Sequence, residues 1–329
     1  MNRSLHVGLM TPVATALFVT FAAALPAVAS DLPDTPGVAR ATGVEPTPSS
    51  ISGTKRALIL CGVSGDADHH KLFAETVGEL HEGLSKQLGF ASNDIGVLFG
   101  DEAKLTDKDL IKTATREGLE KSAKGLRVSL SAEDALWVIV VGHTDYDGKH
   151  SWLNMPGPDI QQADFAKLFH RLPSREQVFF ITTPTSGFYI KPLSAKGRVV
   201  ISEGYKTNET EFPHELARVL TAPPATKEFD VHEDGAPSLF DLYVTVSRNL
   251  AESYSTNELL TTEHPLLDDN GDGRGTEVQI DFLTEEQGGR ANRGGEAAPR
   301  KLSITSDGGI AKSIVNPWMK PGPVSTATE

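Results

Sequence analysis

The feature that most constrains the fold is a run of consecutive apolar residues, ALWVIVV, from Ala135 to Val141. A strand with one face in water alternates apolar and polar residues, whereas this run is apolar at every position. We therefore predict a strand that is buried on both faces, as in a parallel sheet covered by helices on both sides. Four further runs predict strands: Arg56 to Val63, Ile95 to Phe99, Gln177 to Ile181 and Arg198 to Ser202.

The segments between these runs carry helical patterns. From Ala67 to Leu88, apolar residues recur at intervals of three and four, which is the spacing of a helix with one buried face. Further helices are expected over Thr106 to Lys124, Asp159 to Leu172, Phe212 to Leu220 and Ser238 to Tyr254. Strands that alternate with helices predict an α/β fold, specifically a three-layer sandwich with a mostly parallel central sheet.

The first residues are typical of a targeting segment. A positively charged start is followed by an apolar stretch from Met10 to Leu25 and by a signal peptidase-type site, Ala27-Val28-Ala29. We expect the mature protein to be exported, to the periplasm or outside the cell. A membrane anchor is the alternative, but the apolar stretch is shorter than the ~20 residues of a span, and no later segment is apolar enough. The predicted organisation is a signal peptide (1–29), a disordered Pro/Ser/Thr-rich linker (30–54), an α/β domain (55–260) and an acidic, Gly-rich C-terminal extension (261–329).

The composition argues against two classes of binding partner and against an intramolecular disulfide. The formal net charge is -13 and no stripe of Lys and Arg occurs, which argues against nucleic acid or an anionic membrane surface as a partner. The single cysteine, Cys61, excludes an intramolecular disulfide. It lies within an apolar run, so we interpret it as a small buried hydrophobe rather than a reactive thiol.

Ligands of open α/β sheets bind at the carboxyl ends of the strands. This rule directs attention to three loops, Gly62 to Asp68, Gly142 to Pro158 and Thr182 to Gly187. The last of these, the TTPTSG turn, follows a buried strand, and a small-residue turn in that place is a common holder of a catalytic nucleophile. Four charged residues lie near strand ends, and the sequence does not indicate which of them would determine specificity for a ligand: Arg175, Arg198, Glu203 and Lys206.

These segments resemble the caspase/legumain clan of cysteine peptidases, most closely the legumain-like (peptidase C13-like) bacterial proteins with the caspase fold. The resemblance rests on ALILCGVSG, on ALWVIVVGHTDYDG, and on FFITTPTSG followed by RVVISEG. It covers roughly 56–255. It implies a caspase-like fold and cysteine endopeptidase chemistry, in which a histidine base activates a cysteine and backbone N–H groups stabilise the oxyanion.

Carried over to this chain, the family histidine is His143, which is preceded by Gly142 as in the family. The family glycine that follows is replaced by Thr144. Ser186 and Gly187 match the Ser-Gly pair that closes the second motif.

The nucleophilic cysteine then falls on Pro184, which has neither a nucleophilic side chain nor a backbone N–H. The first hypothesis is therefore a non-catalytic peptidase homologue, a pseudoenzyme that binds or scaffolds a protein or peptide. The second is an active hydrolase in which Thr185 or Ser186 replaces the cysteine and His143 is the base. Under the first hypothesis, Ser186 only caps the turn.

A third hypothesis is a calcium-stabilised structural protein. Asp268, Asn270 and Asp272 occupy the first, third and fifth positions of an EF-hand-type loop, with Gly273 at the sixth. Position twelve is Gln279, so the bidentate glutamate is missing, and Glu277 is the expected substitute. The alternative is a turn whose carboxylates bond to backbone N–H groups. No cofactor is required by any of the motifs, and Ca²⁺ is the candidate ion.

Two other polar clusters have weaker metal patterns. Asp230 to Asp241 resembles a decayed EF-hand loop with His232 at the third position, and the alternative is a turn with Ser238 as a helix N-cap. His69 and His70 lie near Asp66 and Asp68, where we favour a solvated helix start over a metal cluster because adjacent residues rarely face one ion.

Overall fold

The computed structural model describes residues 51–100, 111–206, 211–223, 226–231, 235–279 and 307–315. The expected signal peptide and most of the expected linker lie outside these residues. The described chain forms an eight-stranded sheet with the order β11-β10-β9-β8-β4-β1-β2-β3. Its strands are β1 (Lys55–Cys61), β2 (Ile95–Phe99), β3 (Ile111–Thr113), β4 (Ala135–Val141), β8 (Glu176–Ile181), β9 (Arg198–Ser202), β10 (Leu266–Asp268) and β11 (Thr276–Glu277).

The six strands from β9 to β3 are parallel to their neighbours, and only β10 and β11 pair in the antiparallel sense. All five strands predicted from the sequence are present. Every residue of β4 is buried, as its uninterrupted apolar sequence predicts. The α/β fold with a mostly parallel central sheet is therefore confirmed.

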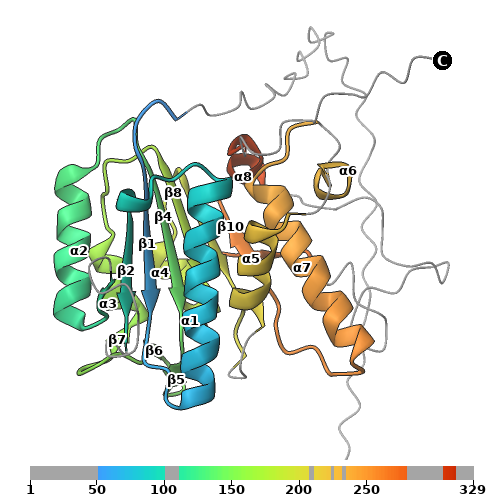
Figure 1. Ribbon diagram of the computed structural model, residues 1–329, viewed down its shortest axis with the longest axis horizontal. Coiled ribbons are helices and arrows are strands. Elements are labelled where there is room, and N and C mark those ends of the chain that lie inside the picture. Colours follow the sequence, from blue (N-terminus) through green and yellow to red (C-terminus); the bar gives the residue numbers. More distant parts are fainter. Residues whose placement is uncertain are drawn as a thin grey trace, which may run out of the picture. The chain divides into compact units, whose positions relative to one another are not determined.

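Helices cover both faces of the sheet, so the structure has three layers (Figure 1). One hydrophobic core lies between the sheet and the helices α1, α5 and α7, and a second lies between the opposite face and α2, α3 and α4. The helices are α1 (Ala67–Glu82), α2 (Arg116–Ser129), α3 (Gln162–Leu168), α4 (Gly187–Leu193), α5 (Phe212–Thr221), α6 (Thr226–Phe229), α7 (Leu239–Thr256) and α8 (Gly309–Ser313). A π-helical turn (Gly83–Gln87) continues α1 to the end predicted for it.

Neighbouring residues of a strand contribute to different cores because successive side chains point to opposite faces. On β4, Trp137, Ile139 and Val141 join the core under α1, whereas Val138 and Val140 join the other. Cys61 is buried in the first of these cores, which confirms its interpretation as a small hydrophobe.

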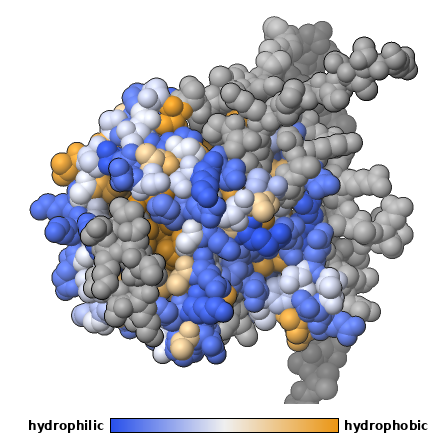
Figure 2. Space-filling model, viewed as in Figure 1, coloured by the Kyte–Doolittle hydropathy of each residue, from blue (hydrophilic) through white to orange (hydrophobic). Residues whose placement is uncertain are grey.

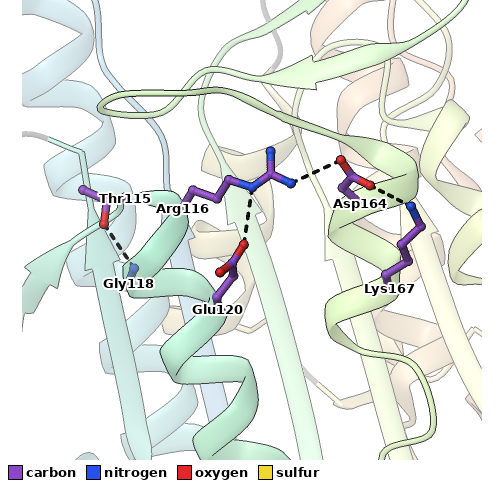
Figure 3. A network of polar contacts seen from close by, with 6 residues as sticks. All are labelled: Thr115, Arg116, Gly118, Glu120, Asp164 and Lys167. Carbon is purple, nitrogen blue, oxygen red and sulfur yellow. Dashed lines mark hydrogen bonds and ion pairs between the residues drawn. The ribbon is translucent and has the colours of Figure 1, made fainter.

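A polar network joins α2 to α3 on the face of the sheet that α2, α3 and α4 cover (Figure 3). Thr115 caps α2 by accepting the N–H of Gly118 at 3.1 Å. The guanidinium of Arg116 donates to Asp164 of α3 at 3.2 Å, and Lys167 donates to the same carboxylate at 2.8 Å. Because these side chains are partly exposed, the pairs contribute only about 0–1 kcal/mol each.

Two predicted helices are shorter than expected. Of the helix predicted over Thr106 to Lys124, residues 106–110 lie outside the described part, and Ile111–Thr113 forms β3 instead. The helix predicted from Asp159 begins at Gln162, because Ile160–Gln161 forms β7.

The predicted loop Gly142 to Pro158 contains a hairpin. Its strands, β5 (Thr144–Tyr146) and β6 (Ser151–Leu153), pair in the antiparallel sense, and β7 adds a third strand. This small sheet lies below the lower ends of β1 and β4 in Figure 1.

The sheet continues past the boundary that we expected at residue 260. β10 pairs with β9, and β11 pairs with β10. The buried Asp269 carboxylate accepts the N–H groups of Gly308 and Ala311, which ties α8 to the same unit. The described parts of the predicted extension therefore belong to the α/β domain.

The view in Figure 2 shows a face that is mainly hydrophilic, with small hydrophobic areas among the polar side chains. No helix in the described part of the chain is both long enough and apolar enough to cross a bilayer.

The burial of β4 predicts a large stability effect for a truncation in this strand. Ile139 is fully buried, so Ile139→Ala is expected to lower the free energy of unfolding by about 2–5 kcal/mol through lost burial and a cavity. Urea unfolding measures this change. Val128→Ala, at a position that is 81% exposed, is the control and is expected to change stability by no more than about 0.5 kcal/mol. Equal effects of the two substitutions would contradict the assignment of β4 to the core.

Candidate functional site

The segments that follow β1, β4, β8 and β9 meet at the carboxyl edge of the sheet. These strands are neighbours in the order β9-β8-β4-β1, so their ends are brought together although they are far apart in sequence. The edge carries Ser64 after β1, His143 after β4, the TTPTSG turn after β8 and Glu203 after β9. Arg198, in contrast, begins β9 at the opposite edge, where its buried guanidinium donates to Leu193 O and Phe169 O.

His143 is held on the side of the sheet that α1 covers. Its Nε2 donates to the carbonyl oxygen of Ser64 at 3.0 Å. The imidazole also packs against Phe73 and His69 of α1, with ring centroids 5.1 Å and 4.8 Å away. The histidine is therefore fixed by the loop after β1 and by the first turns of α1.

The TTPTSG turn is buried and is held by the hairpin after β4. Thr144 Oγ1 donates to the carbonyl oxygen of Pro184, the third residue of the turn. Thr185 Oγ1 lies 3.1 Å from Thr144 Oγ1 and 2.7 Å from Ser151 Oγ. Thr144 thus has a structural role beside the turn.

Thr185 has an unfavourable backbone conformation. Its φ of 56° lies in the left-handed region, which is a genuine outlier for a β-branched residue. Such a conformation costs about 1–3 kcal/mol and persists only where the surroundings impose it. Here the Thr185 N–H donates to Lys206 O at 2.7 Å, while its hydroxyl is fully buried against Ser151.

Ser186 at the start of α4 makes no side-chain cap hydrogen bond, so its hydroxyl does not cap the turn as we expected, and it bonds instead to the segment after β9. Its Oγ accepts the N–H of Glu203 at 2.9 Å, and its own N–H donates to Thr183 O at 3.2 Å. The side chain is fully buried. Both candidate hydroxyl nucleophiles are therefore enclosed and engaged in hydrogen bonds.

A buttress formed by Glu203 to Lys206 holds the turn from the β9 side. In addition to the bonds from Thr185 and Ser186, the Gly187 N–H donates to Gly204 O. A Cβ atom at Gly187 would lie 2.7 Å from the ring of Tyr205 and 2.9 Å from the carbonyl oxygen of Gly204, so a larger residue would displace this segment. The conformation of the turn thus depends on a segment about twenty residues further along the chain.

Glu203, the first residue of the buttress, has a buried carboxyl group near that of Glu263. Glu203 is 1% exposed, and neither of its carboxyl oxygens has a hydrogen-bond partner among the described residues. Burial, together with the nearby Glu263, raises the pKa of Glu203 to about 9. The Glu203 carboxyl is therefore protonated at neutral pH.

Glu263 anchors the first turn of α5. Its carboxylate accepts the N–H groups of Glu211 and Phe212, each at 2.8 Å, and the hydroxyl of Tyr254 at 2.8 Å. Burial raises its pKa to about 7 in spite of these bonds. Sequence reasoning missed this pairing because the two glutamates are 60 positions apart and neither belongs to a recognisable motif.

The predicted calcium loop has its carboxylates bonded to its own backbone. Asp268 accepts the N–H groups of Gly271 and Gly273, and Asn270 and Asp272 each accept an N–H two residues further on. Glu277 bonds to the imidazole of His264 at 3.0 Å. Within the described ranges, no group of three or more His, Cys, Asp or Glu side chains is placed to hold a metal ion. These bonds match the turn interpretation, and calcium binding stays a prediction.

The other two polar clusters are helix starts. Ser238 and Asp241 form a reciprocal capping box at the start of α7, as the alternative interpretation predicts; His232 and Asp234 lie outside the described residues. Asp66 caps α1 by accepting the N–H groups of Asp68 and His69, and its second oxygen bonds to His69 Nδ1 at 2.7 Å. The solvated helix start is confirmed there.

Comparison with protein-family models finds no matching family, and comparison with curated proteins finds no matching relative.

The Glu203 carboxyl predicts a decline of stability with pH. Because its folded pKa is raised from 4.5 to about 9, the folded state binds the extra proton between these values and loses stability as pH rises through them. The carboxyl of Glu263 has a folded pKa of about 7, so most of its effect on stability falls below pH 7. The range from pH 7 to 9 therefore reports mainly on Glu203. Over that range we expect the wild type to lose on the order of 1–2 kcal/mol more of its free energy of unfolding than Glu203→Gln.

Urea unfolding at both pH values, with the exposed Glu252→Gln as control, measures the difference. Parallel pH profiles for wild type and Glu203→Gln would show that the carboxyl is not protonated in the folded protein.

If the Asp268 loop binds calcium at the affinity of extracellular modules, 10 mM calcium is expected to stabilise the protein by about 1.4–2.7 kcal/mol. The readout is the difference in melting temperature between calcium and chelator, with magnesium as the control ion. Asp272→Ala removes an exposed ligand and should abolish the difference. Identical melting of the wild type in calcium and in chelator would exclude this site.

Proposed function

We propose that the protein is an exported, caspase/legumain-like peptidase homologue without peptidase activity, which acts as a binding or scaffold module for a protein or peptide. The proposal combines the sequence resemblance with the arrangement at the carboxyl edge. Because β4 and β8 are adjacent, His143 and the TTPTSG turn end neighbouring strands, as the resemblance implies.

The single observation that carries the proposal is Pro184. The family nucleophile position is occupied by a residue with no acidic proton on its side chain and no backbone N–H. The turn is nevertheless firmly held by Thr144 and by the buttress. A turn that keeps its shape without a nucleophile suits a protein in which the edge of the sheet binds rather than cleaves.

A second candidate function is favoured by the backbone of Thr185. Strained residues cluster at active sites, and Thr185 at φ 56° is such a residue. In this alternative, Thr185 or Ser186 is the nucleophile and His143 is the base. The burial of both hydroxyls argues against it, because the carbonyl carbon of a substrate must reach the nucleophile.

The third candidate, a calcium-stabilised structural protein, depends on the Asp268 loop. It requires no chemistry at the carboxyl edge. The melting experiment described above tests it and leaves the other two candidates unaffected.

The decisive experiment is a peptidase assay of the purified protein on a mixed peptide library, in calcium and in chelator, with His143→Ala alongside. We expect no cleavage by either protein and no labelling by a fluorophosphonate probe. Cleavage that is lost in His143→Ala would overturn the proposal. Thr185→Val and Ser186→Ala would then identify the nucleophile, and a contaminating peptidase would be recognised by cleavage that survives all three substitutions.

A further inference from the structure

The buttress connects the TTPTSG turn to the segment that follows α7. On one side, Lys206 O accepts the N–H of Thr185, and the Glu203 N–H donates to Ser186 Oγ. On the other side, the carbonyl oxygen of Glu203 accepts the N–H of His264 at 2.9 Å. The turn therefore keeps these bonds only while the buttress keeps its position.

The carboxyl group of Glu203 is the unfavourable part of the buttress. It is 1% exposed, and neither of its oxygens has a hydrogen-bond partner among the described residues. A carboxylate in such a place loses its hydration without gaining a donor, so the neutral, protonated form is favoured there. The cost of ionisation is removed in one of two ways, by a bound proton or by movement of the carboxylate into water.

The groups that act on Glu203 disfavour its ionisation. Burial and the nearby Glu263 both raise its pKa. Glu263 accepts its bonds from uncharged donors, the N–H groups at the start of α5 and the hydroxyl of Tyr254, and Glu211 adds a further negative charge beside it. The imidazole of His264 bonds to a carboxylate of β11 instead. An ionised Glu203 would therefore meet like charge in a buried place.

The rest of the buttress is suited to movement. Gly204 has a φ of 133°, a conformation that favours glycine, and it provides a pivot directly after Glu203. Tyr205 and Lys206 are exposed, so they lose less burial on displacement than core residues do. Thr185 is strained while its N–H is bonded to Lys206 O, and it can relax once that bond is broken.

We propose that Glu203 and the buttress form a proton-controlled latch on the TTPTSG turn. While the carboxyl is protonated, the buttress is closed and holds the turn. When the proton leaves, the buttress moves outward about Gly204 until the carboxylate reaches water. Thr185, Ser186 and Gly187 then lose their bonds to it. This inference goes beyond the proposed function and does not depend on it, since it concerns the shape of the turn and not a ligand.

The direction of the pH dependence follows from the proton that opening releases. In the closed state the pKa of Glu203 is raised from 4.5 to about 9, and in the open state the carboxyl regains its ordinary value in water. Between these two values, opening releases one proton, so the equilibrium constant for opening rises about tenfold per pH unit. The latch is tightest in acid and loosens as pH rises toward 9.

Amide hydrogen exchange measures the opening directly, because a hydrogen-bonded N–H exchanges only when its bond breaks. The exchange rates of the Thr185 and Gly187 N–H groups are measured by NMR at pH 6, 7 and 8 and divided by the rates of an unstructured peptide at the same pH. The protection of both groups is expected to fall about tenfold per pH unit. Ile139, in the centre of the sheet, reports global unfolding and is expected to be better protected at each pH.

Variants of Glu203 separate the latch from other effects of pH. Glu203→Gln removes the titration, so the protection of the turn is expected to become independent of pH. Glu203→Met, with an apolar side chain of similar length, provides the same test if the buried amide of the first variant prevents folding. Glu252→Gln, at an exposed position of α7, is the control and is expected to keep the wild-type pH dependence. Melting temperatures confirm that each variant is folded.

Two results would overturn the latch. The first is protection of Thr185 and Gly187 that is independent of pH in the wild type, or that depends on pH equally in the wild type and the Glu203 variants. The second is exchange of these two groups that is no faster than that of Ile139, because the turn would then open only by global unfolding. The peptidase assay tests the proposed function separately, so either proposal can fail without the other.

Discussion

The burial of β4 on both faces is the constraint on which the rest of the structure depends. A strand without a polar face needs a helical layer on each side and a strand at each edge, and β4 has β1 and β8 as neighbours. Parallel neighbours end at the same edge, so the loops after all three strands are brought to one place. The position of His143 and the TTPTSG turn at the same edge of the sheet is thus a consequence of how the core is formed.

The local shape of this edge is determined by a second set of contacts. The strained Thr185 of the TTPTSG turn is held by Lys206, while Ser186 and Gly187 are held by Glu203 and Gly204. The buttress itself begins with Glu203, whose buried carboxyl group lies near that of Glu263. The turn and the buried acid pair are therefore linked through the backbone of residues 203–206.

The long apolar strands and the helices with regular periodicity could be predicted from the sequence, because their signals are local. Strands of two or three residues, such as β3 and β11, have no periodicity to detect, and the helix α4 was missed because Pro192 interrupts its pattern. The candidate residues His143 and Pro184 were found through a motif. The ring contacts among Tyr146, Phe188 and Tyr205 and the glutamate pair were not, since these residues come from separate segments that meet only after the strands have paired.

The antiparallel strand β10 has a consequence for solubility. The main-chain groups along the outer edge of a five-residue strand such as β9 would offer a template for pairing with another molecule, but β10 occupies that edge. In the described part of the chain, the sheet ends in β11 and β3, which are two and three residues long. Strands this short present too few free donors and acceptors to recruit a foreign strand, so the fold resists edge-to-edge aggregation without relying on charge alone.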